Sequence, residues 1–171
     1  VAIKPGKPVI LAIVEGKPVI GLPGYPVSAY IAFENFVAPV LAMMGQRTLR
    51  EDYEAKAIIS KRLVSSLKHK EYVRVKTGMV GDKMIAAPLA RGAGAAMSLV
   101  RADGFCVIDQ NCEGMDAGEE VTVSLYRNPS EIKNTVVVTG SHDLILDVAA
   151  DLIPQQYKGM HLSSTHVGSM G

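Results

Sequence analysis

The segment Gly21-Leu22-Pro23-Gly24-Tyr25-Pro26-Val27-Ser28 decides how the first part of this chain folds. It follows the apolar residues 18–20 and precedes an amphipathic stretch, which predicts a strand, a rigid turn and a helix that begins at Pro26. Gly21 and Gly24 let a ligand approach the backbone of the turn closely. A helix that leaves such a turn directs unpaired N–H groups toward an anion, so we predict an oxyanion or phosphate pocket. The alternative, a junction that holds no ligand, is common in α/β proteins.

The residues on either side of this turn indicate the end of a larger α/β domain. Upstream, Lys4-Pro5-Gly6-Lys7-Pro8 supplies two lysines, and residues 9–14 form an apolar run that predicts a buried strand. Downstream, apolar residues recur at helical spacing from Val27 to Met44. Pro39 predicts a kink or break in that helix, and Gly45 predicts its end. One hairpin is not a sheet, so we expect further strands of the same domain to precede this part.

Short strands dominate the middle of the chain. After a polar linker, residues 46–54, apolar residues alternate with polar ones or cluster between glycines. The predicted strands are residues 55–60, 71–76, 83–88, 104–109 and 120–126. One or two helical turns are expected within residues 95–102. The regular spacing of the strands predicts a small β-barrel or sandwich.

Asn128-Pro129-Ser130 marks a second boundary, and a short tail follows it. Residues 134–139 predict a strand, and Ser141 or Asp143 is expected to cap a helix over residues 144–153. The predicted fold class is therefore an α/β fragment (a strand hairpin plus a helix) followed by a small all-β barrel and a short βα tail. Because a βα unit of this size cannot bury its own faces, we expect it to be docked, swapped or poorly ordered.

Composition and charge exclude several classes of protein. The 171 residues are 48% hydrophobic and carry a net charge of +1, which gives no footprint for nucleic acid or an anionic membrane. Basic residues concentrate in 61–76 and acidic ones in 103–120, and solvated faces are favoured over a binding stripe. Cys106 and Cys112 match no zinc or redox spacing and predict reduced structural thiols in a cytoplasmic protein. No uninterrupted apolar run reaches the ~18 residues that span a bilayer. The chain begins at Val1 without a signal peptide, and we interpret it as a fragment.

No pair of residues has the spacing of a nucleophile and its base. His142 and Asp143 are adjacent, so their side chains point apart. His161 and His166 are five apart, which is not the spacing of a helical metal pair, and structural or surface histidines are favoured. Arg91-Gly92-Ala93-Gly94 lacks the full dinucleotide fingerprint, so a barrel loop is favoured there.

Several motifs occur together in an order that is similar to one family. Lys4-Pro5-Gly6-Lys7-Pro8 and a hairpin lead into Gly21–Ala29, and Arg91–Gly94 and Ser98–Gly104 follow downstream. Over about residues 1–127 this order closely resembles the molybdopterin molybdenumtransferase family, which includes MoeA and the gephyrin E domain.

The resemblance implies a domain plan and an activity. Residues 1–47 correspond to the end of the molybdopterin-binding α/β domain, and residues 48–130 to the C-terminal β-barrel, domain IV. Family members insert molybdate or tungstate into adenylylated molybdopterin with a divalent cation, usually Mg²⁺, and form homodimers. The family's acidic metal ligands lie upstream of the present sequence. The resemblance therefore implies half a site here, with no metal ligands and no turnover by this chain alone.

The resemblance also implies roles for particular residues. A lysine suits phosphate or molybdate as a point charge, prolines shape the loop, and glycine and serine supply backbone and hydroxyl donors. By motif matching, the catalytic residues are Lys4, Lys7, Pro23 and Pro26, and the cofactor-binding residues are Gly21, Gly24, Tyr25 and Ser28. Tyr25 stands where the family usually has Asn, which either alters the pterin contact or stacks a ring over the pocket.

The tail carries a weaker resemblance. A strand, then Gly140-Ser141-His142-Asp143, a helix and residues 163–169 look like the start of a periplasmic-binding-protein-like domain at residues 131–171. Such domains occur fused behind the molybdenumtransferase module in some microbes. Two alternatives to an enzyme stay open: a module that binds a small ligand or oxyanion, and a barrel that supports dimers without catalysis.

Overall fold

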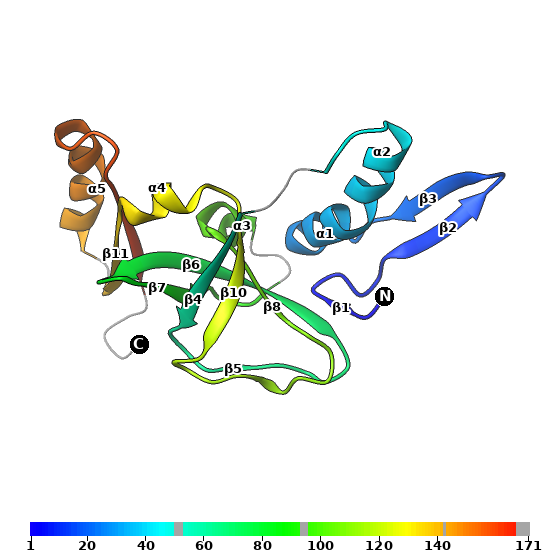
Figure 1. The fold of residues 1–171 in the computed structure, drawn as a ribbon, viewed down its shortest axis with the longest axis horizontal. Helices are drawn as coiled ribbons and strands as arrows, with labels where there is room; N and C mark the ends of the chain where they lie inside the picture. Colours follow the sequence, from blue (N-terminus) through cyan, green and yellow to red (C-terminus); the bar gives the residue numbers. More distant parts are fainter. Residues whose placement is uncertain (50–52, 93–95, 142, 167–171) are drawn as a thin grey trace.

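The computed structural model describes residues 1–49, 53–92, 96–141 and 143–166 and contains three successive parts (Figure 1). A hairpin and a helical segment lie at one end, a barrel lies in the middle, and a strand–helix–strand unit lies at the other end. The predicted fold class is confirmed. Ala93, Gly94 and His142, like the C-terminal residues from 167 onward, lie outside the described residues, as do the predictions made for them.

Five strands close into the central barrel. They are β4 (Tyr53–Ile59), β6 (Lys70–Val80), β7 (Lys83–Pro88), β8 (Gly104–Ile108) and β10 (Glu120–Leu125). The order β6-β7-β4-β10-β8 closes because the long strand β6 pairs with β8 through its first half and with β7 through its second. Closure leaves no free edge in these strands, so the barrel alternative is correct and the sandwich is wrong. A small ladder of β5 (Leu63–Val64) and β9 (Gly114–Met115) and the helix α3 (Ala96–Arg101) complete this part.

Side chains that alternate along the strands fill the barrel. Val73 and Val75 of β6 and Val123 of β10 point inward and are buried. Cys106 of β8 is a buried free thiol, and burial raises its pKa to about 11. Cys112 is also free and partly buried, in agreement with the predicted structural thiols.

The basic and acidic halves of the barrel meet in surface ion pairs. Arg62 Nε lies 3.1 Å from Asp116 Oδ1, and Lys70 Nζ lies 3.4 Å from Asp109 Oδ1. Exposed pairs of this kind contribute at most about 1 kcal/mol each. They agree with the solvated faces that the sequence favours.

The first part contains three short strands and a broken helix. The elements are β1 (Ile3–Lys4), β2 (Ile10–Val14), β3 (Lys17–Gly21), α1 (Pro26–Ala32), η1 (Phe33–Val37) and α2 (Ala38–Met44). The prediction of a buried strand over residues 9–14 is wrong for this chain, because Ile10 is 66% and Ile13 79% exposed. Among the described residues β2 pairs only with β3, so the hairpin has no sheet to cover its faces.

The predicted break in the helix is present and takes the form of a π-helical turn, η1. Pro39 has no N–H to donate to the carbonyl four residues back, and the Ala38 N–H bonds the Phe33 carbonyl, five residues back. Gly45 ends α2 as predicted, but its φ is −87°, and Gln46 adopts the left-handed conformation instead, with φ 49°.

The combined helical segment Pro26–Met44 is long and apolar enough, by length and composition, to cross a membrane. The sequence prediction counted only uninterrupted apolar runs and therefore missed it. Core helices of soluble proteins meet the same criterion, so the finding is weak evidence. Val27 and Ile31 of this segment are buried beside Ile3 and Phe105, which ties the helix to the barrel.

The tail is a parallel βαβ unit. It contains α4 (Pro129–Lys133), β11 (Thr135–Gly140), α5 (Leu144–Gln156) and β12 (His161–His166). Asn128 caps α4, which the sequence did not predict, and Asp143 caps α5 as predicted through a 2.9 Å bond from the Ile145 N–H. The unit is docked, because Val137 lies against Gly78 of β6 so closely that a Cβ on Gly78 falls 2.4 Å from Val137 Cγ2.

We predict that Gly78→Ala loosens the docking of the tail. Its added methyl group overpacks the contact with Val137, at a cost of about 1–3 kcal/mol. Amide hydrogen exchange in β11 should accelerate while the core of the barrel is unchanged. Gly140→Ala is the matched control, because a Cβ there meets nothing within 4 Å. Equal exchange in the Gly78→Ala variant and the wild type contradicts this account of docking.

Candidate functional site

The loop that carries the two lysines is fixed to the barrel by a short parallel ladder. Ile3 and Lys4 of β1 pair with Lys70 and Glu71 at the start of β6. Ile3 is buried, and Gly6 packs so tightly beside it that an added Cβ lies 2.9 Å from Ile3 Cδ1. The ladder therefore places the Lys4 side chain next to the side chain of Glu71.

Glu71 is a buried carboxylate that forms ion pairs with a lysine from the first part of the chain and an arginine from the barrel. Its side chain is 4% exposed, and its Oε2 lies 3.5 Å from Lys4 Nζ. Its Oε1 lies 3.3 Å from Arg91 Nη1, and Ser65 Oγ donates to Oε2 at 2.8 Å. Arg91 Nη1 also donates to the Val64 carbonyl at 2.7 Å. Because a buried carboxylate needs such partners, Glu71 holds Lys4 and Arg91 close to each other.

Arg74 lies three residues after Glu71 in β6 and is also buried, at 4% exposed. Its Nη1 and Nη2 donate to the carbonyls of Gly92 and Ala90 at 3.1 and 3.0 Å. Its Nε is buried and has no hydrogen-bond partner among the described residues. Burial lowers the pKa of this guanidinium. The Nε of Arg74 is thus a donor nitrogen that a ligand could satisfy.

These side chains line one cavity of about 310 Å³ between β1, β6 and the loop after β7. Lys4, Arg74 and Arg91 bring three positive charges to its wall, and Glu71 brings one negative charge. The wall is therefore net positive, and the Lys4 and Arg91 side chains stay partly exposed, at 42% and 39%. An anion with several oxygens matches this combination of point charge and fixed N–H donors.

Lys7 is exposed and lies near the same wall without lining the cavity. Its effect is seen at His69, whose pKa is lowered by desolvation and then by the charges of Lys7, Lys4 and Lys68. The charges of the two motif lysines therefore both oppose protonation of the His69 ring, after the larger effect of desolvation.

The remaining predicted residues form the turn and the start of α1 rather than the wall of this cavity. Ser28 is buried, and its carbonyl lies close to Gly6 of the lysine loop. Pro23 is buried, whereas Gly24, Tyr25 and Pro26 are exposed, and Gly21 packs against Ile10. None of these residues is among those that line the 310 Å³ cavity. Their roles stay predictions.

The sequence reasoning missed Glu71 and Arg74 as site residues. Both lie in the best predicted strand, and they were treated as solvated charges of its alternating pattern. The sequence of β6 held no signal for their burial, which comes from β1 and from the loop after β7. Arg91 was noticed in its glycine motif but was assigned to a barrel loop.

The described residues contain no group of three or more His, Cys, Asp or Glu side chains that could hold a metal ion. Glu71 is already engaged by Lys4, Arg91 and Ser65. The described residues therefore do not fit a Mg²⁺ site of their own.

Comparison with known proteins shows similarity to one family over the central part of the chain. Residues 56–126 match the sequence profile of the MoeA C-terminal region (domain IV). The chain is 34% identical over 127 residues to the putative molybdopterin biosynthesis protein MJ0666 of Methanocaldococcus jannaschii. It is 28% identical over 131 residues to the molybdopterin molybdenumtransferase of Haemophilus influenzae. These matches cover 74% and 75% of this chain but only 29% and 32% of the relatives.

Solved structures of related proteins match a similar share of the chain. A molybdopterin biosynthesis MoeA protein from Pyrococcus horikoshii matches with a TM-score of 0.57 and 37% identity, over 74% of this chain and 31% of that chain. A molybdenum cofactor biosynthesis protein from Pyrococcus furiosus matches with a TM-score of 0.59 and 32% identity, over 73% of this chain and 43% of that chain. The comparisons give no support for a periplasmic-binding-protein-like domain at residues 131–171, and that interpretation stays a prediction.

We predict that Lys7→Ala raises the pKa of His69 toward its ordinary value, because the lysine charge that opposes protonation is removed. An NMR titration of the His69 ring measures this directly. Lys17→Ala, in the turn of the hairpin, is the matched control and should leave the titration unchanged. An unaltered His69 pKa in Lys7→Ala shows that Lys7 does not share the site.

Proposed function

We propose a role in molybdenum cofactor biosynthesis for this chain, whose residues 56–126 match the MoeA C-terminal region (domain IV). The chain spans less than a third of the length of the curated relatives it matches. We infer that it is the part of a molybdopterin molybdenumtransferase that binds anionic groups of the substrates, adenylylated molybdopterin and molybdate.

One observation carries this proposal. Lys4, from the motif that resembles the family, and Arg74 and Arg91, from the barrel, line one net-positive cavity. The two parts are separated in sequence by a hairpin, a helical segment and two strands. A shared cavity at their junction supports a site that needs both parts.

The residues of the cavity suit different tasks in oxyanion transfer. The Lys4 ammonium can follow a moving anion, since it is a point charge on a flexible stem. Arg74 is held at two backbone carbonyls, and its Nε is a fixed donor that orients an oxygen of phosphate or molybdate. Glu71 keeps the cations in place and lowers the net charge of the wall, so that a bound oxyanion can also leave.

In the proposed site, the turn at Gly21–Ser28 forms the second wall around the substrate. Lys7 remains assigned to the pterin phosphate or molybdate, and Pro23 and Pro26 to the shape of the loop. From the family resemblance we also infer that another part of the parent protein supplies the Mg²⁺ ligands. The same resemblance suggests that the parent protein forms a homodimer and is located in the cytoplasm.

A binding module without catalysis is the second candidate, and the tail motivates it. Its parallel strands β11 and β12 lie next to a capped helix, as in ligand-binding βαβ units. Equilibrium dialysis of molybdate against the parent protein, with and without the residues after Ser130, distinguishes an oxyanion site in the first two parts from a binding module in the tail. Unchanged binding without the tail counts against the module.

The proposed function predicts the behaviour of two motif variants of the parent protein. Lys7→Ala should reduce molybdenum insertion by on the order of tenfold or more, because a charge-assisted contact to an anion contributes about 1.5–3 kcal/mol. Pro26→Ala should also reduce insertion, because the proline ring fixes the backbone of the turn. Insertion is measured as molybdenum bound to pterin per unit time. Lys17→Ala should retain wild-type activity, since it lies at the far turn of the hairpin. Wild-type rates in both motif variants would falsify the assignment of the turn and its lysines.

A further inference from the structure

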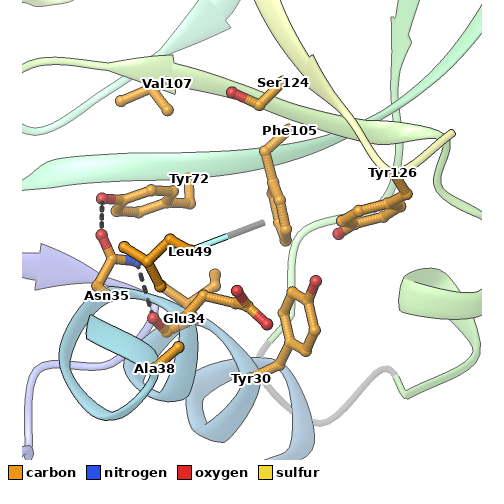
Figure 2. A pocket seen from close by; sticks show the side chains of 11 residues that line it. Tyr30, Glu34, Asn35, Ala38, Leu49, Tyr72, Phe105, Val107, Ser124 and Tyr126 are labelled. Atoms are coloured by element: carbon orange, nitrogen blue, oxygen red, sulfur yellow. Dashed lines mark hydrogen bonds between the residues drawn. The ribbon is translucent and has the colours of Figure 1, made fainter. Parts of the chain in front are cut away.

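A second cavity, of about 340 Å³, lies between the helical segment and the outer face of the barrel (Figure 2). Tyr30 of α1 and Glu34 of η1 face it from one side. Tyr72 of β6 and Phe105 of β8 face it from the barrel, and Tyr126 follows β10. The proposed function uses none of these side chains to hold its substrates.

Four aromatic rings form a continuous cluster along this cavity. The Phe105 ring lies 5.6 Å from Tyr126, 6.1 Å from Tyr30 and 6.3 Å from Tyr72, measured between ring centroids. Three of the four ring pairs meet edge to face, and Tyr30 stacks on Phe105 with an interplanar angle of 25°. Because the rings are neighbours with different orientations, a group in the cavity lies near several of them at once.

The charge of the cavity is opposite to that of the Lys4 site. Among the described residues that line it, Glu34 is the one ionisable acid or base apart from the three phenols, and none is Lys, Arg or His. Figure 2 shows the Glu34 carboxylate reaching toward Tyr30 and the edge of Phe105. Burial raises the pKa of both Tyr72 and Tyr126, so these phenols stay neutral beside the carboxylate at physiological pH. The wall therefore repels anions.

The π-helical turn fixes the wall from the helix side. Asn35 accepts a 2.6 Å hydrogen bond from the Tyr72 hydroxyl and donates a 2.8 Å bond to the Ile31 carbonyl. The first bond joins η1 to β6 across the cavity, and the second fixes the Asn35 side chain against α1 (Figure 2). The Tyr72 ring and the backbone of η1 are thus in place before any ligand arrives, which reduces the entropy cost of binding.

We propose that this cavity binds a small organic cation, an ammonium head group with its methyl or methylene substituents. Aromatic faces attract such cations through their quadrupoles, and a carboxylate beside the rings adds a full negative charge. The cation's methyl groups replace water at apolar ring surface, which an inorganic cation cannot do. The volume lies at the lower end of the range for ligand pockets, so the ligand is small.

The test compares two ligands of the same shape that differ in charge. Choline and its neutral carbon isostere 3,3-dimethyl-1-butanol are titrated into the isotopically labelled full chain, and NMR shifts of residues in η1, β6 and β8 are followed. We expect choline to bind on the order of fivefold more tightly than the isostere. Equal affinities, or no saturable binding of choline, overturn the proposal.

Variants locate the binding at the cavity. Glu34→Gln should weaken choline on the order of fivefold and bring it close to the isostere, since the carboxylate supplies the charge. Glu34 is exposed, so this variant keeps the fold. Glu15→Gln, an exposed acid in the turn of the hairpin, is the matched control and should bind choline like the wild type. Undiminished binding in Glu34→Gln contradicts the proposal.

Discussion

The buried carboxylate of Glu71 is the interaction on which the arrangement of this chain depends. It lies at the start of β6, and it is compensated by Lys4 from the first part of the chain, by Arg91 from the loop after β7 and by Ser65. A buried charge without partners is strongly unfavourable, so the β1–β6 ladder and the positions of both cations are coupled. The first part of the chain and the barrel are therefore joined at their junction by the ion pairs of Glu71.

This junction gives the chain two cavities of opposite character. Tyr72 lines both of them. The cavity beside Glu71 contains three cations and an unpaired donor of Arg74, which suits an oxyanion. The cavity beside Glu34 contains aromatic rings and a single carboxylate, which suits a cation. Because η1 and β1 both contact β6, the position of the first part relative to the barrel sets the shape of both cavities.

Patterns that are local in sequence could be predicted, and those that depend on packing could not. The alternation in β6 and the strand β7 gave correct elements, and Asp143 gave a correct cap. The two residues of β1 are too few to show a periodicity, so their ladder with β6 could not be predicted from the sequence. The ion pair of Lys4 with Glu71, which depends on this ladder, could not be predicted either. The exposure of β2 could not be foreseen from its apolar composition, since it depends on which strands lie beside it. Arg74 and Glu71 resemble surface charges in the sequence, because their burial depends on β1 and on the loop after β7, which are distant in the chain.

The most direct test of the central claim is the position of bound molybdate. Crystals of the full-length parent protein, soaked in molybdate, can be measured at the molybdenum absorption edge to locate the metal by anomalous scattering. The account predicts a peak within hydrogen-bonding distance of Lys4, Arg91 and the Nε of Arg74. A peak found only elsewhere, with this cavity filled by water, contradicts it.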